Sequence, residues 1–153
     1  MSSHDALQRV GAAAAAIIDV DAGVVALTGR ASGNVVRFDP RKAVVANSLA
    51  YLATEATIRG GVGEAYDVTL VLRAEADGDA SSDSAPEFAS KLLGAAIEAL
   101  AGSGGVAAFA AQSVDAVVTS WKPHTPEDNA GDASSTNPAV VAAEAELTVW
   151  ITL

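Results

Sequence analysis

The chain has 153 residues, a net charge of −10 and no cysteine, which suits one domain and excludes disulfides and cysteine nucleophiles. Half of the residues are hydrophobic but only 5% are aromatic, so leucine, isoleucine and valine must supply most of the core. Residues 1–63 hold six basic and five acidic side chains, whereas residues 64–153 hold three and fourteen, and such acidity disfavours phosphate binding.

The first half of the chain predicts two helical segments followed by two strands. Ser2 or Ser3 can cap a helix whose apolar residues, from Leu7 to Ile18, fall on one face. A shorter helical turn is expected over 21–27, with Gly29 as its C-terminal cap. The strand candidates are 34–39 and 49–58, although the alanines of 49–58 would also suit a helix, and the glycines at 60, 61 and 63 mark a turn.

The second half of the chain has the clearest secondary-structure signals. Residues 65–76 alternate between apolar and mixed positions, which predicts a strand with one buried face. Pro86 suits the first turn of a helix whose apolar stripe ends at Gly102. The other predicted segments are a helical turn, two strands and the exposed loop between these strands: 106–111, 114–121, 143–153 and 122–138.

This order of segments predicts an α+β fold. We expect a single domain over 1–153, with a mixed or antiparallel sheet of about four to five strands and helices packed on one face. The N-terminus lacks the pattern of a secretory signal. The apolar run 12–18 is shorter than the roughly 20 residues that a bilayer requires, so a soluble chain without a membrane partner is expected.

The histidines and glycines form no recognisable catalytic pattern. His4 falls in a terminus and His124 in a loop, and a general base must be held rigidly near its substrate. The glycine clusters at 60–63 and 102–105 lack the strand-to-helix context or the lysine of a phosphate-binding turn. We therefore interpret both histidines as surface residues and both clusters as turns.

The acidic residues likewise predict no cofactor or metal. Asp77, Asp79 and Asp83 do not continue into the ligand spacing of a calcium loop. Glu55 and Glu75 fall on neighbouring predicted strands and could pair, but no other residue supports glycosidase chemistry. The sequence thus predicts a protein that is not an enzyme and binds no cofactor.

The two tryptophans, Trp121 and Trp150, lie on the predicted strands that flank the long loop. By strict alternation, Trp121 shares a strand face with Asp115 and Thr119, and Trp150 lies on a polar face of its own strand. Packing under a helix or at a sheet margin would explain them. The alternative is an aromatic anchor in a subunit interface, where tryptophan is enriched. The sequence leaves both readings open.

In its order of segments, the chain resembles the tail-terminator (tail-completion) proteins of long-tailed bacteriophages. The resemblance rests on a helix leading into VVALTG, the strand NVVRFDP, the strand AYDVTLVLRAEADG, the helix PEFASKLLGAAIEAL and the closing strands. It covers most of the chain through pattern and order. The chain departs from the family in the NSLAYLATEA strand, which has no clear proline before it, and in its long acidic loop.

The resemblance implies a structural virion protein at the head-proximal end of the tail, assembled in the host cytoplasm. Such proteins form a hexameric ring that ends tail-tube polymerisation and joins the tail to the head connector, with DNA passing through the lumen. The implied partners are other copies of the chain, the tail-tube protein and the connector protein. The alternatives are another neck or tail-tube protein, or a small cellular adaptor domain.

The near-neutral first part of the chain holds four basic residues that could meet acidic surfaces of adjoining subunits. These candidate interface residues are Arg37, Arg41, Lys42 and Arg59. Together with Trp121 and Trp150, they make up the predicted contact residues.

Overall fold

The computed structural model describes residues 2–38, 48–59, 65–77, 85–124 and 140–152. In chain order these ranges hold the following elements: α1 (Ser3–Asp19), α2 (Ala22–Thr28), β1 (Val36–Phe38), β2 (Ser48–Ile58), β3 (Ala65–Asp77), α3 (Ala85–Ala101), α4 (Gly105–Ala111), β4 (Asp115–His124) and β5 (Val140–Thr152). The predicted α+β fold is confirmed.

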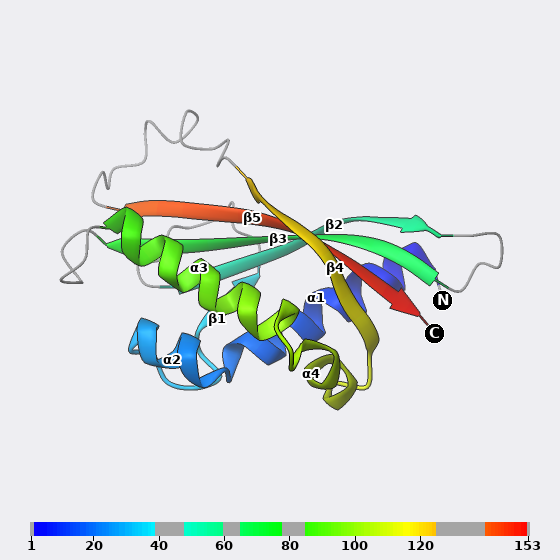
Figure 1. Cartoon of the computed structure of the whole chain (residues 1–153), viewed down its shortest axis with the longest axis horizontal. Coiled ribbons are helices and arrows are strands. Elements are labelled where there is room, and N and C mark those ends of the chain that lie inside the picture. The colour runs from blue at the N-terminus through cyan, green and yellow to red at the C-terminus, as the bar shows by residue number, and fades with distance from the viewer. Residues whose placement is uncertain (1, 39–47, 60–64, 78–84, 125–139, 153) are drawn as a thin grey trace.

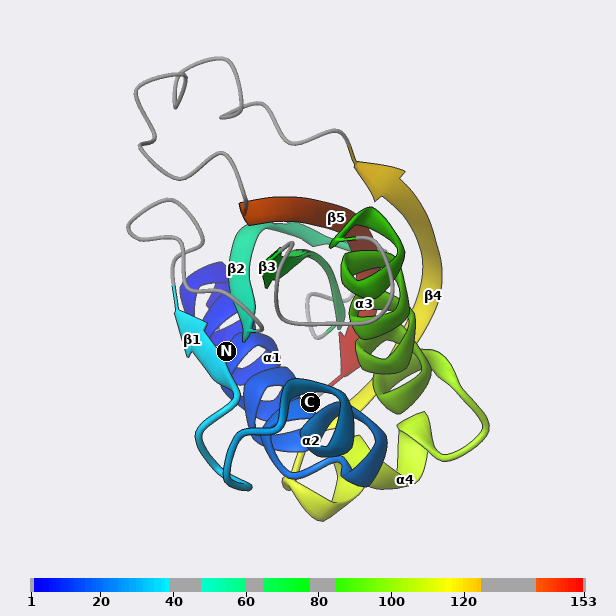
Figure 2. The same ribbon diagram turned by 90° about the vertical axis from the view of Figure 1, so that its left-hand side faces the viewer.

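The described strands form one curved sheet in the order β1-β2-β3-β5-β4. The short β1 runs parallel to β2, and the other neighbours are antiparallel. All four described helices lie on one side of this sheet, as the front view and the end view both show (Figures 1 and 2). The predicted arrangement of helices on one face is therefore correct.

Local sequence explains where the first helices begin and end. The Ser2 hydroxyl accepts a hydrogen bond from the Asp5 N–H, and the Asp5 carboxylate accepts one from the Ser2 N–H, a reciprocal capping box. The Ser2 backbone and hydroxyl both lower the pKa of Asp5. Gly29 ends α2 with a φ of 67°, a left-handed conformation that favours glycine.

The core lies between the helices and the covered face of the sheet. Alternate residues of β3 and β5 point into it, and α1 and α3 add their apolar faces. Its largest fully buried side chains include Leu70, Leu72, Leu147, Leu92 and Phe109. The strand predicted over 65–76 is thus present and extends to Asp77.

The structure changes the predicted end of one strand. β4 continues through Pro123 to His124, so the first residues of the predicted 122–138 loop belong to the sheet. Proline at this position is compatible with an edge strand, because an outward-facing backbone nitrogen needs no partner. The remainder of that predicted loop lies outside the described residues, as do Asp79, Asp83 and the glycines at 60, 61 and 63.

Candidate subunit interface

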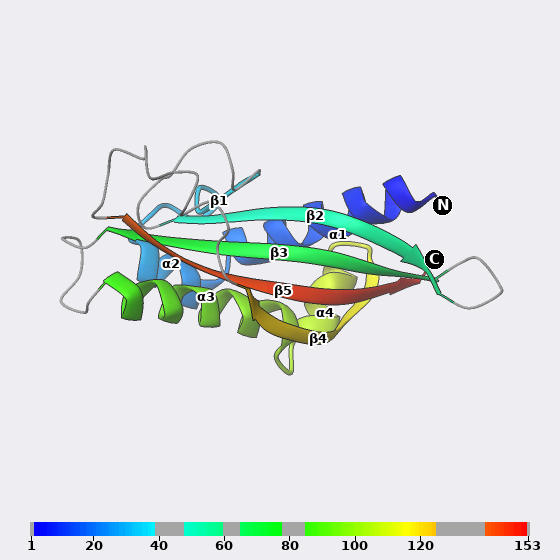
Figure 3. The same ribbon diagram turned by 90° about the horizontal axis from the view of Figure 1, so that it is seen from above.

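The described sheet has two margins with unpaired strand edges. At one margin, β5 is the only described strand that pairs with β4. At the other margin, β1 pairs with β2 only from Leu49 to Tyr51, so in the described part of the chain the edge of β2 from Leu52 to Ile58 has no strand beside it. Figure 3 shows the short β1 and these two margins from above. Unpaired strand edges are templates for pairing with another chain.

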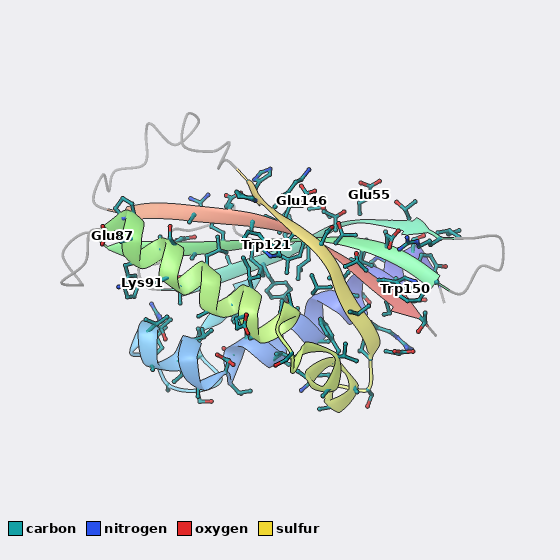
Figure 4. The ribbon with its side chains drawn as sticks, viewed as in Figure 1. Glu55, Glu87, Lys91, Trp121, Glu146 and Trp150 are labelled. Carbon is teal, nitrogen blue, oxygen red and sulfur yellow. The ribbon has the colours of Figure 1, made fainter. Side chains whose placement is uncertain are left out.

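Trp121 lies on the β4 margin with half of its surface exposed, at 51%. It is opposite Leu147, a core residue, so its side chain is on the helix side of the sheet (Figure 4). The predicted face is therefore wrong. The β4–β5 register shifts between Val118 and Ser120, which makes Thr119 an extra residue and turns Trp121 to the opposite face.

A groove of about 500 Å³ lies beside the other margin, on the same side of the sheet. It is lined by the first turns of α1 and by Tyr51 and Ala53 of β2. Gly11 keeps the helix close to the strand, since a Cβ at Gly11 would lie 3.3 Å from Cε2 of Tyr51. Burial raises the pKa of Tyr51 above its ordinary value. The groove is thus a mostly apolar concavity next to an unpaired edge.

Trp150 lies on the open face of the sheet, opposite Asp67 on β3 and Val117 on β4. It is 38% exposed, and Glu146 and Glu55 lie on the same face, away from the helices (Figure 4). The two tryptophans therefore lie on opposite faces. They do not form one shared aromatic patch.

The open face also carries a shielded cluster of charged groups. Arg73 reaches the carboxylates of Glu75, at 3.3 Å from Nε, and of Glu144, at 2.8 Å from Nη1. His124 Nδ1 lies 2.9 Å from the same Glu144. The Arg73, Glu75 and Glu144 side chains are 4%, 0% and 8% exposed, although the described helices all lie on the other face.

Two sequence-based interpretations are corrected by this cluster. His124 is not a loosely held surface residue, because it belongs to β4 and contacts Glu144. Glu55 and Glu75 do not form a pair: Glu55 is opposite Thr69 and exposed, whereas Glu75 is opposite Ser48 and fully buried. The sequence missed the cluster because Arg73 and Glu144 are 71 residues apart and only the strand register joins them.

The predicted basic contact residues are only partly located. Arg59 follows β2 and forms an exposed ion pair with Asp67, 3.2 Å from Nη1 to the carboxylate. Arg37 belongs to β1, but its side chain is not among those that the structure describes. Arg41 and Lys42 lie outside the described residues. The structure thus leaves the interface role of these four residues a prediction.

Within the described ranges, no three histidine or acidic side chains gather in a way that would hold a metal ion. In the same ranges, no single helix is long and apolar enough to cross a bilayer, and two sharply bent pairs, α1 with α2 and α3 with α4, pass that test only together. The chain matches no protein-family model and no curated protein.

Proposed function

We propose that this chain is a structural protein without enzymatic activity, and that its copies assemble into a ring. The main support is the pair of different margins that have no described strand beside them, at β4 and at residues 52–58 of β2. Each margin has an apolar feature beside it, Trp121 at the first and the groove at the second. A contact between two different surfaces repeats from copy to copy, and it closes into a ring when the rotation allows.

We further propose that the ring is the tail terminator of a long-tailed bacteriophage. The order of segments that resembles this family corresponds to the order of helices and strands in the fold. The net charge of −10 suits a channel wall that must let DNA pass without retaining it, because acidic side chains repel phosphate. The proposed partners are the tail-tube protein on one side and the head connector on the other.

Growth of tail tubes tests the proposed function. The purified chain is added to tubes of the cognate tail-tube protein that elongate freely, and tube length and end density are measured by electron microscopy. We expect capped tubes that stop growing, and light scattering of the isolated cap should give a multiple of the 15.2 kDa subunit mass. A chain that stays monomeric beside tubes that keep growing would refute the proposal.

The same assay, run with tail tubes and in a second mixture with the head connector, separates the terminator from the alternative functions. A tail-tube protein would extend the tubes, and another neck protein would bind the head connector without stopping tube growth. A small adaptor domain would remain monomeric both with tail tubes and with the head connector. Each of these results would overturn the terminator assignment.

A further inference from the structure

We propose that two copies of this chain join by adding the part of β4 before Pro123 to the edge of β2 from Leu52 to Ile58 in the next copy, beside which the described residues place no strand. In this contact, Trp121 inserts into the groove beside Tyr51 and Ala53 of the neighbour. The biological role of the contact rests on the proposed ring-forming function. The contact itself is inferred from strand direction, strand register and exposure within one copy.

Strand direction favours this joint. β2 is antiparallel to β3, β3 to β5, and β5 to β4, so three reversals leave β4 running opposite to β2. A neighbour rotated about an axis parallel to the strands keeps its strand directions. Its β2 would therefore meet β4 in the antiparallel orientation, and the helices of both copies would lie on the same side of the extended sheet.

Strand register places Trp121 level with the groove, at the same position along the strand direction. Trp121 is opposite Leu147, Leu147 is opposite Leu70, and Leu70 is opposite Ala53. All four residues lie on the helix side, because directly opposed residues share a face. A sheet continued without any slide along the strands thus brings Trp121 next to Ala53, which lines the groove. A contact that repeats without translation along the rotation axis is the kind that closes into a ring.

Charges on the open face are complementary across the same joint. Ser120 is opposite Thr148, Thr148 is opposite Thr69, and Thr69 is opposite Glu55. Ser120 and Glu55 therefore lie at the same position along the strand direction. Lys122, two residues from Ser120 on this face, is 70% exposed and lies 3.6 Å from Glu146. It would be a diagonal neighbour of the exposed Glu55 of the next copy, within reach of a long side chain.

Trp121 is expected to supply much of the affinity, because the new strand ladder must be short. The extra residue Thr119 interrupts β4 on one side of Trp121. On the other side, Pro123 lacks a backbone donor and is level with Tyr51, where β1 already pairs with β2. Such interruptions protect edge strands from indiscriminate pairing. A large aromatic side chain that fills a neighbouring pocket is a common centre of binding energy in interfaces.

Engineered disulfides test the geometry, and the natural chain has no cysteine to interfere. Ser120→Cys combined with Glu55→Cys should give a covalent ladder of multimers under mild oxidation. Within one copy, the two positions are three strand spacings apart, about 14 Å, too far for a disulfide. The matched control combines Ser120→Cys with Thr57→Cys, which shifts one thiol by about 7 Å along the strand and should not form the ladder.

Tryptophan fluorescence tests the inserted side chain. In Trp150→Phe, Trp121 is the sole tryptophan, and its emission should shift to shorter wavelength as copies assemble. Trp121→Ala should weaken self-association at least tenfold while leaving the circular-dichroism spectrum of the monomer unchanged. Unshifted emission in assembled rings, or rings as stable as the parent in Trp121→Ala, would overturn this contact while the ring itself stands. A chain that is monomeric even on tail tubes would overturn both.

Discussion

The two faces of β3 are built by alternating residues of one strand, but they are stabilised in different ways. On the covered face, Leu70 and Leu72 are fully buried against helices. On the open face, Arg73 and Glu75 are buried as well, but they are held by ion pairs. Apolar burial is tolerant of small changes in geometry, whereas a buried charge depends on its partner. The two faces should therefore respond differently to mutation.

Removal of Arg73 should have the largest effect on stability. Arg73→Ala leaves the carboxylates of Glu75 and Glu144 shielded from water without their cation. Breaking a buried ion pair in this way costs about 3–5 kcal/mol, measured as the loss in free energy of unfolding by urea. The triple variant Arg73→Met, Glu75→Gln, Glu144→Gln removes the charges together and should recover much of the loss. Equal destabilisation in both variants would show that charge is not the cause.

Shortening a core residue on the covered face should cost a similar or slightly smaller amount. Leu70→Ala removes buried apolar contacts and leaves a cavity, with an expected loss of about 2–5 kcal/mol. This loss should be independent of salt concentration and of pH between 5 and 8. A salt-dependent loss at Leu70 would remove the proposed distinction between the two faces.

The exposed part of the open face should tolerate substitution. Trp150→Ala is expected to change the free energy of unfolding by less than about 1 kcal/mol, because the side chain is 38% exposed and lies away from the helices. Thermal unfolding of the monomer measures this, with Leu147→Ala on the covered face of the same strand as the control. A loss at Trp150 comparable to that at Leu147 would mean that the open face also stabilises the fold by apolar burial.

The sequence predicted the helices and strands better than the contacts between strands, because the signals for single elements are local. Strict alternation over 65–76 and the capping groups at Ser2 and Gly29 are signals between near neighbours, and each predicted its element correctly. The extra residue at Thr119 is defined by the partner strand and leaves no mark in β4 alone, so the face of Trp121 was wrong. The Arg73 cluster depends on the pairing of β3, β4 and β5, which adjacent residues do not reveal.

The exposed ion pair between Lys122 and Glu146 should contribute less than the Arg73 cluster. Their separation is 3.6 Å and the lysine side chain is 70% exposed, so solvent and salt screen the attraction. Lys122→Ala is expected to lower the free energy of unfolding of the monomer by at most about 1 kcal/mol at low salt, and by less at 0.5 M salt. A larger or salt-independent loss would assign Lys122 a packing role instead.

The smallest expected effect is a pH dependence of stability from Tyr51, on the covered face beside the groove. Burial raises the pKa of its phenol, so the folded chain holds this proton more tightly than the unfolded chain. The stabilisation is complete below the unfolded value near pH 10 and is lost as the pH rises through the folded pKa. Tyr51→Phe should remove this part of the decline above about pH 10, as unfolding by urea at each pH would reveal. If Trp121 of a neighbour covers the groove, the phenol of Tyr51 should titrate at still higher pH in the assembled ring than in the monomer, because the neighbour removes more water from it.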